Sequence, residues 1–99
     1  MNFRVRFTLE AKADIERLYS FLAERDFAAA ERAFEVIGNA WPILEQFPFS
    51  CRKADDANSF LRELIISFGK SGYVALFEVE DDRTVTVLAI RHQLEDDYY

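Results

Sequence analysis

The sequence of 99 residues contains one cysteine, one histidine, three glycines and two prolines. Cys51 alone cannot form an internal disulfide, and the chain has no Cys/His cluster that would bind zinc. No apolar run approaches the roughly 18–20 residues of a transmembrane helix. The start of the chain alternates too strictly between apolar and basic residues for a signal peptide. We therefore expect a soluble, cytoplasmic protein.

Basic residues are also scarce. Twelve Lys and Arg against 18 Asp and Glu give a net charge of −6. The acidic residues concentrate at 55–56, 78–82 and 95–97. Proteins that grip a phosphate backbone normally carry a basic surface, so autonomous binding of nucleic acid is disfavoured.

Core-forming residues, in contrast, are plentiful. Hydrophobic residues make up 51% of the chain and ten residues are Phe, which excludes general disorder. The length fits one domain, residues 1–99, that is large enough to bury a core without disulfides. We find no internal repeat, low-complexity tract or linker.

The first half of the chain has one β pattern and then helical periodicity. Residues 2–8 alternate apolar and polar side chains, which predicts a half-buried strand. Thr8 is placed to cap a helix from about Leu9 to Arg25, and Asp26 ends this helix or caps the next. Helical spacing then continues to about Gln46, with a kink or a broken final turn predicted at Pro42. The short join predicts an antiparallel helical hairpin.

The second half has β periodicity after one long polar connection, residues 47–59. Strands are predicted at residues 60–68, 73–79 and 84–92, separated by short turns, as in an antiparallel meander. The predicted order is β-α-α-β-β-β. The fold class is therefore α+β, with the helical hairpin packed on one face of a small, mostly antiparallel sheet.

Parity predicts which side chains share a face of this sheet. Arg62 should lie with Leu64, and Arg91 with Val85 and Val87, whereas His92 should lie on the face opposite Arg91. The middle strand is apolar on both faces apart from Glu78. We therefore expect its second face to be covered by the C-terminal tail or by another chain.

Polar and charged side chains are concentrated where the last predicted strand passes into the C-terminal tail. Arg91, His92, Glu95 and Tyr98 place a cation, the only imidazole, a carboxylate and a phenol close together in sequence. These groups suit proton transfer or the binding of an anionic partner. Together with Arg62, three of these residues, Arg91, His92 and Glu95, could in principle supply the groups that a general acid–base ribonuclease needs. Those groups are a base, a cation for the phosphorane and an acid for the leaving group.

Each of these residues also has a simpler reading. Arg62 and Arg91 could form ordinary ion pairs, and backbone groups could satisfy His92 at the strand end. Tyr98 could dock on apolar surface, and Glu95 belongs to a solvated acidic run. Metal-ligand spacing, a glycine-rich phosphate loop and a Ser-His-Asp order are absent, so no metal or cofactor is predicted.

The chain resembles the ParE/RelE toxin superfamily of bacterial toxin–antitoxin modules, nearer its ParE or "plasmid stabilization" branch. The resemblance spans nearly the whole chain, and its last block is the most specific. It is carried by Phe3-Arg4-Val5-Arg6-Phe7-Thr8 with Ala11, Asp14-Ile15, Leu18-Tyr19-Ser20-Phe21-Leu22, Arg62-Glu63-Leu64, Ser71-Gly72-Tyr73-Val74-Ala75-Leu76-Phe77-Glu78-Val79, Val85-Thr86-Val87-Leu88-Ala89-Ile90-Arg91-His92-Gln93 and Glu95-Asp96-Asp97-Tyr98.

This resemblance implies a β-α-α-β-β-β fold and a toxin that a cognate, co-encoded antitoxin holds inactive by wrapping around it. ParE-type members are thought to block DNA gyrase, whereas RelE-type members cleave mRNA on the ribosome. The residues at which ribonuclease members place functional groups are matched here by Arg62, Arg91, His92 and Tyr98.

The charge of this chain favours the ParE reading. RelE-like ribonucleases are strongly basic, whereas this chain has three Lys and a net charge of −6. We therefore expect a gyrase-directed toxin that needs no catalytic residue. The alternatives are an mRNA interferase and a non-toxic or degenerate member that acts as a binding protein. The residues expected to bind partners are Arg62, Tyr73, Arg91, His92, Glu95 and Tyr98.

Overall fold

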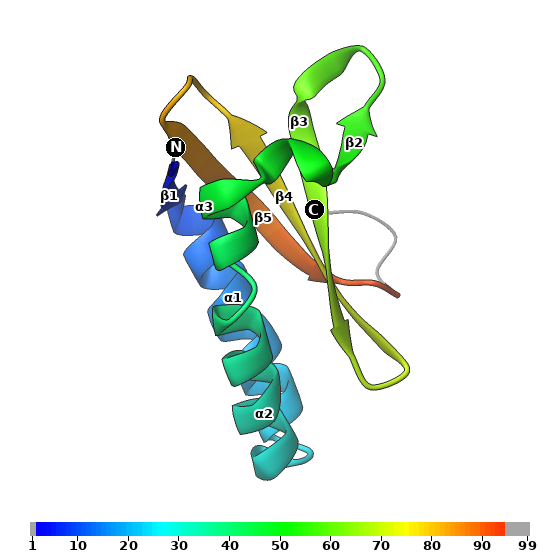
Figure 1. The fold of residues 1–99 in the computed structure, drawn as a ribbon. Coiled ribbons are helices and arrows are strands. Elements are labelled where there is room, and N and C mark those ends of the chain that lie inside the picture. The colour runs from blue at the N-terminus through cyan, green and yellow to red at the C-terminus, as the bar shows by residue number, and fades with distance from the viewer. Residues whose placement is uncertain (1, 95–99) are drawn as a thin grey trace.

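The computed structural model describes residues 2–94, whose strands form a five-stranded sheet in the order β1-β5-β4-β3-β2 (Figure 1). β1 runs parallel to β5, and every other neighbouring pair is antiparallel. This arrangement confirms the α+β class and the three-strand meander. The strands are β1 (Arg4–Phe7), β2 (Arg52–Asp55), β3 (Asn58–Phe68), β4 (Ser71–Val79) and β5 (Thr84–His92).

Two helices form an antiparallel hairpin that covers one face of the sheet, α1 (Leu9–Ala23) and α2 (Phe27–Gly38) (Figure 1). Both begin at the caps that the sequence predicts. The side chain of Thr8 accepts a hydrogen bond from the Ala11 amide at 3.0 Å, and Asp26 accepts one from the Ala29 amide at 3.0 Å. Each cap satisfies a backbone N–H that the first turn of a helix leaves without a partner.

The expected break near Pro42 is confirmed. α2 ends at Gly38, and a separate short helix, α3 (Pro42–Gln46), begins with Pro42 in its first turn. Proline is tolerated there because the first turn needs no amide donor, whereas inside a continuous helix it would remove one hydrogen bond. α3 leads the chain over the end of the sheet toward β2 (Figure 1).

The prediction of one long polar connection over residues 47–59 is wrong, because most of this segment forms regular secondary structure. It contains a 3₁₀ turn, η1 (Pro48–Ser50), and the edge strand β2, which pairs with β3. Asp55 accepts a hydrogen bond from the Ala57 amide at 2.9 Å and so closes the tight turn between these strands. Aspartate favours such turns, but an exposed edge strand lacks the apolar alternation by which strands are recognised.

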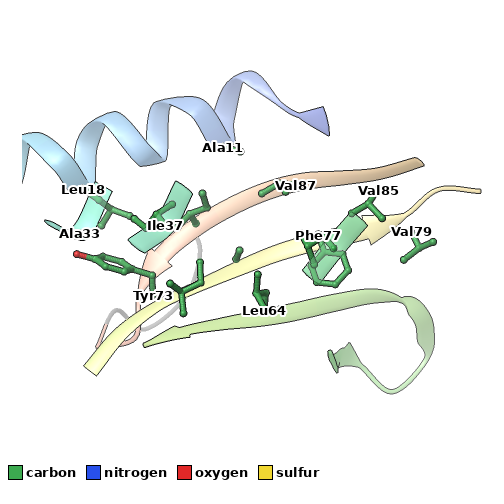
Figure 2. Close-up of a cluster of buried hydrophobic side chains, with 14 residues drawn as sticks. Ala11, Leu18, Ala33, Ile37, Leu64, Tyr73, Phe77, Val79, Val85 and Val87 are labelled. Carbon is green, nitrogen blue, oxygen red and sulfur yellow. The ribbon is translucent and has the colours of Figure 1, made fainter. Parts of the chain in front are cut away.

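The core lies between the hairpin and the sheet (Figure 2). Alanines at the helix faces let the layers approach closely, and the sheet contributes the larger side chains. Phe7 adds an edge-to-face contact with Trp41 at 5.0 Å between ring centroids. The buried residues that Figure 2 labels are Ala11, Leu18, Ala33, Ile37, Leu64, Tyr73, Phe77, Val79, Val85 and Val87.

The predicted faces of the last strand are wrong at its far end because β5 contains a bulge. Phe77 pairs with Val87 but Leu76 pairs with Ala89, so Leu88 is an extra residue in the ladder. A bulge of one residue reverses which face every later side chain occupies. His92 therefore lies opposite Tyr73 on the helix-covered face, and Arg91 lies opposite Val74 on the other face.

Residues of α1 and its cap hold this bulged segment in place. The Thr8 amide donates to the Val87 carbonyl at 3.0 Å, and the Thr8 hydroxyl donates to the Leu88 carbonyl at 3.1 Å. Farther along α1, the Asp14 carboxylate accepts a hydrogen bond from the Ile90 amide at 2.9 Å. β1 ends at Phe7, so these groups satisfy the β5 edge where no strand follows.

Candidate partner-binding cleft

A cleft of about 640 Å³ opens between the second half of α1, the β3–β4 turn and the end of β5. Its lining is mainly apolar, with Ser71, Tyr73, His92 and Arg17 as its polar members. The full lining consists of Arg17, Leu18, Phe21, Leu22, Phe68, Gly69, Ser71, Tyr73, His92 and Leu94.

Two glycines shape the turn that forms one wall. Gly69 has a φ of 64°, a left-handed conformation that other residues rarely adopt. At Gly72 a Cβ atom would lie 2.1 Å from the Ile66 carbonyl oxygen, so only glycine allows this close approach. Together they bring Ser71 across from the end of β5, where the Gln93 amide donates to the Gly72 carbonyl at 2.8 Å.

His92 is oriented by hydrogen bonds at both ring nitrogens. The Leu94 amide donates to Nδ1 at 3.2 Å, and Nε2 lies 3.1 Å from the Ser71 hydroxyl oxygen. Since Nδ1 accepts, we assign the neutral ring with its proton on Nε2, which donates to Ser71. In this arrangement neither nitrogen presents a lone pair toward the cleft, as a general base would.

Tyr73 forms the floor of the cleft beside His92. Its side chain is only 4% exposed, and its ring meets the His92 ring edge-on at 5.5 Å between centroids. Burial raises the pKa of the Tyr73 phenol above its ordinary value, because desolvation disfavours the phenolate. Tyr73 thus contributes a neutral aromatic surface to the cleft.

The rim of the cleft exposes large apolar side chains. Phe21 is 58% exposed and Leu94 is 79% exposed. The Arg25 guanidinium lies 3.9 Å from the Phe21 ring centroid and donates to the Phe21 carbonyl at 2.9 Å, which fixes this part of the rim. Exposed apolar groups around a hollow are typical of a surface that a partner covers.

Arg62 lies far from the cleft and is engaged by backbone. On β3 it pairs with Phe77, four residues along β4 from the partner of His92, a separation of about 13 Å. Its guanidinium donates to the carbonyls of Ser59 and Cys51 at 2.8 Å and of Phe49 at 3.2 Å. In the simpler reading of Arg62, we expected an ion pair with an acidic residue. The observed acceptors are the carbonyls of Phe49 in η1, of Cys51 directly after η1, and of Ser59 in β3.

Arg91 lies on the sheet face opposite the cleft, and its guanidinium donates to the His92 carbonyl at 3.3 Å. The structure therefore brings together Tyr73 and His92 of the predicted partner-binding set, and it separates Arg62 and Arg91 from them and from each other. Glu95 and Tyr98 lie outside the described residues.

Sequence reasoning missed Ser71, Phe21 and Leu94 as cleft residues. Phe21 gave a usable signal, because it is a large apolar side chain beside the buried stripe of its helix. Ser71 gave none, because its role depends on which strand end the turn faces.

The described residues contain no metal-binding cluster, and no helix among them is long and apolar enough to cross a bilayer. Within residues 2–94, the chemistry of the cleft is that of apolar and aromatic recognition with a few fixed polar groups.

Comparisons with known proteins agree on one family. Residues 5–97 match the model of the family described as the ParE toxin of the type II toxin–antitoxin system, parDE. The toxin named RelE3 of Caulobacter vibrioides is 35% identical over 86 residues, which cover 86% of this chain and 88% of the relative. Its toxin RelE1 is 35% identical over 95 residues, 96% of this chain and 98% of the relative.

Among solved structures, one described as the chromosomal ParDE TA system from P. aeruginosa shares the fold. It superposes with a TM-score of 0.74 at 19% identity, over 91% of this chain and 95% of the matched chain.

Proposed function

Because the chain belongs to the ParE toxin family of type II toxin–antitoxin systems, we propose that it arrests growth by acting on a protein target, DNA gyrase. We further propose that a cognate antitoxin holds it inactive. The match to the ParE family model over residues 5–97 supports the first part, and the exposed apolar cleft supports the second.

The single observation that carries the choice of a protein target is the separation of the basic groups. Cleavage of RNA by acid–base chemistry needs a cation near the phosphate and a base within hydrogen-bond reach of the attacking hydroxyl. Here the Arg62 guanidinium is bound by three carbonyls, and Arg91 and His92 lie on opposite faces of the sheet. The net charge of −6 also opposes capture of an RNA backbone.

The antitoxin is proposed to occupy the cleft. Its rim and floor offer Phe21, Leu94 and Tyr73 as apolar contacts. A segment that fills this cleft and continues along the hairpin would bury on the order of 1,500 Å² in total, as stable complexes do. The free toxin should then self-associate, and its melting temperature should rise when the antitoxin is added.

A second candidate function, ribosome-dependent cleavage of mRNA, is favoured by the two relatives named as RelE toxins. Their 35% identity extends over most of the chain. In this reading the candidate catalytic residues are Arg62, Arg91, His92 and Tyr98.

One experiment separates the two functions. The chain is induced in bacteria, and purified chain is added to gyrase with relaxed plasmid. We expect filamentous cells, intact mRNA, and supercoiling that falls with increasing amounts of the protein. Rapid mRNA cleavage with normal supercoiling would refute the gyrase proposal and establish the ribonuclease. Normal growth with neither effect would refute both and leave a binding protein.

A further inference from the structure

A second patch of exposed aromatic side chains lies at the opposite end of the sheet from the cleft. Phe49 of η1 is 47% exposed and Phe60 of β3 is 52% exposed. Their rings meet edge-on, with centroids 6.0 Å apart. Large apolar side chains that gather on a surface usually mark a binding site.

These rings border a groove of about 660 Å³. Phe3, at the start of the chain, lies across from them, and the buried Val79 of β4 forms part of the floor. Val79 is six residues along β4 from Tyr73, so the groove lies about 20 Å from the floor of the cleft. Two partners, or two segments of one partner, could therefore bind at the same time.

Carboxylates form the remaining wall, contributed by the end of β4 and the β4–β5 turn. Glu78, Glu80, Asp81 and Asp82 line the groove, and none of its lining residues is basic. Glu80 accepts a hydrogen bond from the Thr86 hydroxyl, and Asp81 accepts one from the Arg83 amide at 2.8 Å. That amide, with nearby Arg4 as a smaller contribution, lowers the pKa of Asp81.

The basic residues nearest to this wall face elsewhere. Arg4 and Arg83 line a neighbouring hollow that shares Asp81 with the groove. Arg62 is held by carbonyls behind Phe49, with its guanidinium carbon 5.2 Å from the ring centroid. Within the groove, the charges of Glu78, Glu80 and Asp82 therefore meet no basic side chain of its lining.

We propose that this groove binds a basic peptide segment of a protein partner, in which Arg or Lys alternates with apolar residues. The apolar residues would pack on Phe49 and Phe60, and the cations would face the rings and the carboxylates. The Arg62 guanidinium already makes a contact of this cation–ring kind with Phe49 within the chain. The choice of a basic partner follows from the charge of the wall, and it does not depend on which cellular target the toxin attacks.

The test is a titration of the isotope-labelled 99-residue chain with peptides. Binding is monitored through the NMR signals of the backbone amides. The probes are two capped hexapeptides, one alternating leucine with arginine and the other leucine with glutamate. We expect the basic peptide to shift the amides of Phe49, Phe60 and Glu78–Asp82, and to bind at least about fivefold more tightly than the acidic one. Raising the ionic strength from about 0.1 M to about 1 M should weaken this binding, since it shortens the screening length.

Two exposed variants check that the groove is responsible. Phe60→Ser should weaken binding of the basic peptide about fivefold or more, and Asp82→Asn about twofold to threefold. Phe34→Ser, which removes a ring of similar exposure from α2, should leave it unchanged. Because all three residues are exposed, the variants should fold.

Three results would overturn the proposal. Equal binding of both peptides would mean that the patch is apolar only. Shifts confined to Ser71, Tyr73 and His92 would move the basic segment to the cleft. A fall in the sedimentation coefficient of the free protein on Phe60→Ser would mean that a second copy of this chain covers the patch. None of these results bears on whether gyrase is the target.

Discussion

At one end of the sheet the His92 ring lines an open cleft, whereas at the other end the Arg62 guanidinium is enclosed by the carbonyls of Ser59, Cys51 and Phe49. Both residues are basic, and both stand on strands beside aromatic rings. The difference lies in the backbone around them. Phe49 of η1, Cys51 directly after it and Ser59 of β3 present carbonyls to Arg62, whereas the β3–β4 turn forms one wall of the cleft beside His92.

This comparison separates two uses of a polar residue. Arg62 ties η1 and the following Cys51 to β3, so its loss should affect the free energy of unfolding. His92 lines the cleft, where the Ser71 hydroxyl and the Leu94 amide bond its ring and Tyr73 packs edge-on against it, so its loss should affect binding. Variants of the two residues should therefore separate an effect on stability from an effect on binding.

The Arg62→Met variant should lower the free energy of unfolding by about 2–4 kcal/mol, because three carbonyls lose a charged donor. Urea denaturation provides the measurement. The matched control is Arg52→Met, which breaks the ion pair with Glu63 at 2.8 Å, at a side chain that is 58% exposed, and should cost about 1 kcal/mol or less. If Arg62→Met unfolds like the wild type yet no longer arrests growth, Arg62 belongs to the functional site instead.

The Asp14→Ala variant should lower the free energy of unfolding by about 1–3 kcal/mol, because the amide of the buried Ile90 loses its acceptor. Asp14→Asn keeps an acceptor oxygen and should cost less. Hydrogen exchange at the Ile90 amide should become faster in the alanine variant, and the exposed Glu16→Ala on the same helix serves as control. Unchanged exchange at Ile90 would show that Asp14 does not hold the β5 bulge.

The parts of the fold that the sequence predicted are those fixed by local patterns. Thr8 and Asp26 cap their helices as expected, and Pro42 marks the break before α3. The meander followed from apolar runs separated by short turns. β2 was missed because its pattern is polar and its pairing depends on the turn that Asp55 closes.

The error in the faces of β5 has a different cause. The extra residue at Leu88 is stabilised by Thr8 and Asp14, which are far away in the sequence, so no pattern within the strand reveals it. That one residue exchanges the faces of Arg91 and His92. Of the predicted partner-binding residues, His92 and Tyr73 therefore line the cleft, and no pattern in the sequence indicates that Arg62 and Arg91 lie elsewhere.

The positions of Arg91 and His92 predict unequal effects on toxicity. Arg91→Ala removes a guanidinium from the sheet face opposite the cleft. If this face contacts the target, the variant should need about tenfold more protein for growth arrest, about 1.4 kcal/mol of binding. His92→Gln keeps a neutral planar group and should change the required amount by less than about threefold. A ribonuclease would instead lose about 10²–10⁴-fold activity with His92→Gln.

Growth arrest is measured from a titrated promoter, with folding checked by circular dichroism. Loss of toxicity in a folded His92→Gln protein would count against a protein target. If both variants keep full toxicity, neither residue belongs to the functional surface.

The smallest expected effect concerns pH and the floor of the cleft. Burial raises the pKa of Tyr73, so the folded state keeps the phenol proton at pH values where the unfolded chain has lost it. The stability linked to this group is fully present below the ordinary tyrosine pKa of about 10 and is lost as the pH rises through the folded value. The urea midpoint of the wild type should therefore fall between about pH 9 and about pH 11, and Tyr73→Phe should flatten that fall.

Tyr19 also has a raised pKa, chiefly through its hydrogen bond to Glu31, so Tyr19→Phe measures how much of the slope arises outside the cleft. If the urea midpoint falls equally with pH in wild type and Tyr73→Phe, the Tyr73 phenol is exposed to solvent in the folded protein. The cleft would then extend down to that phenol.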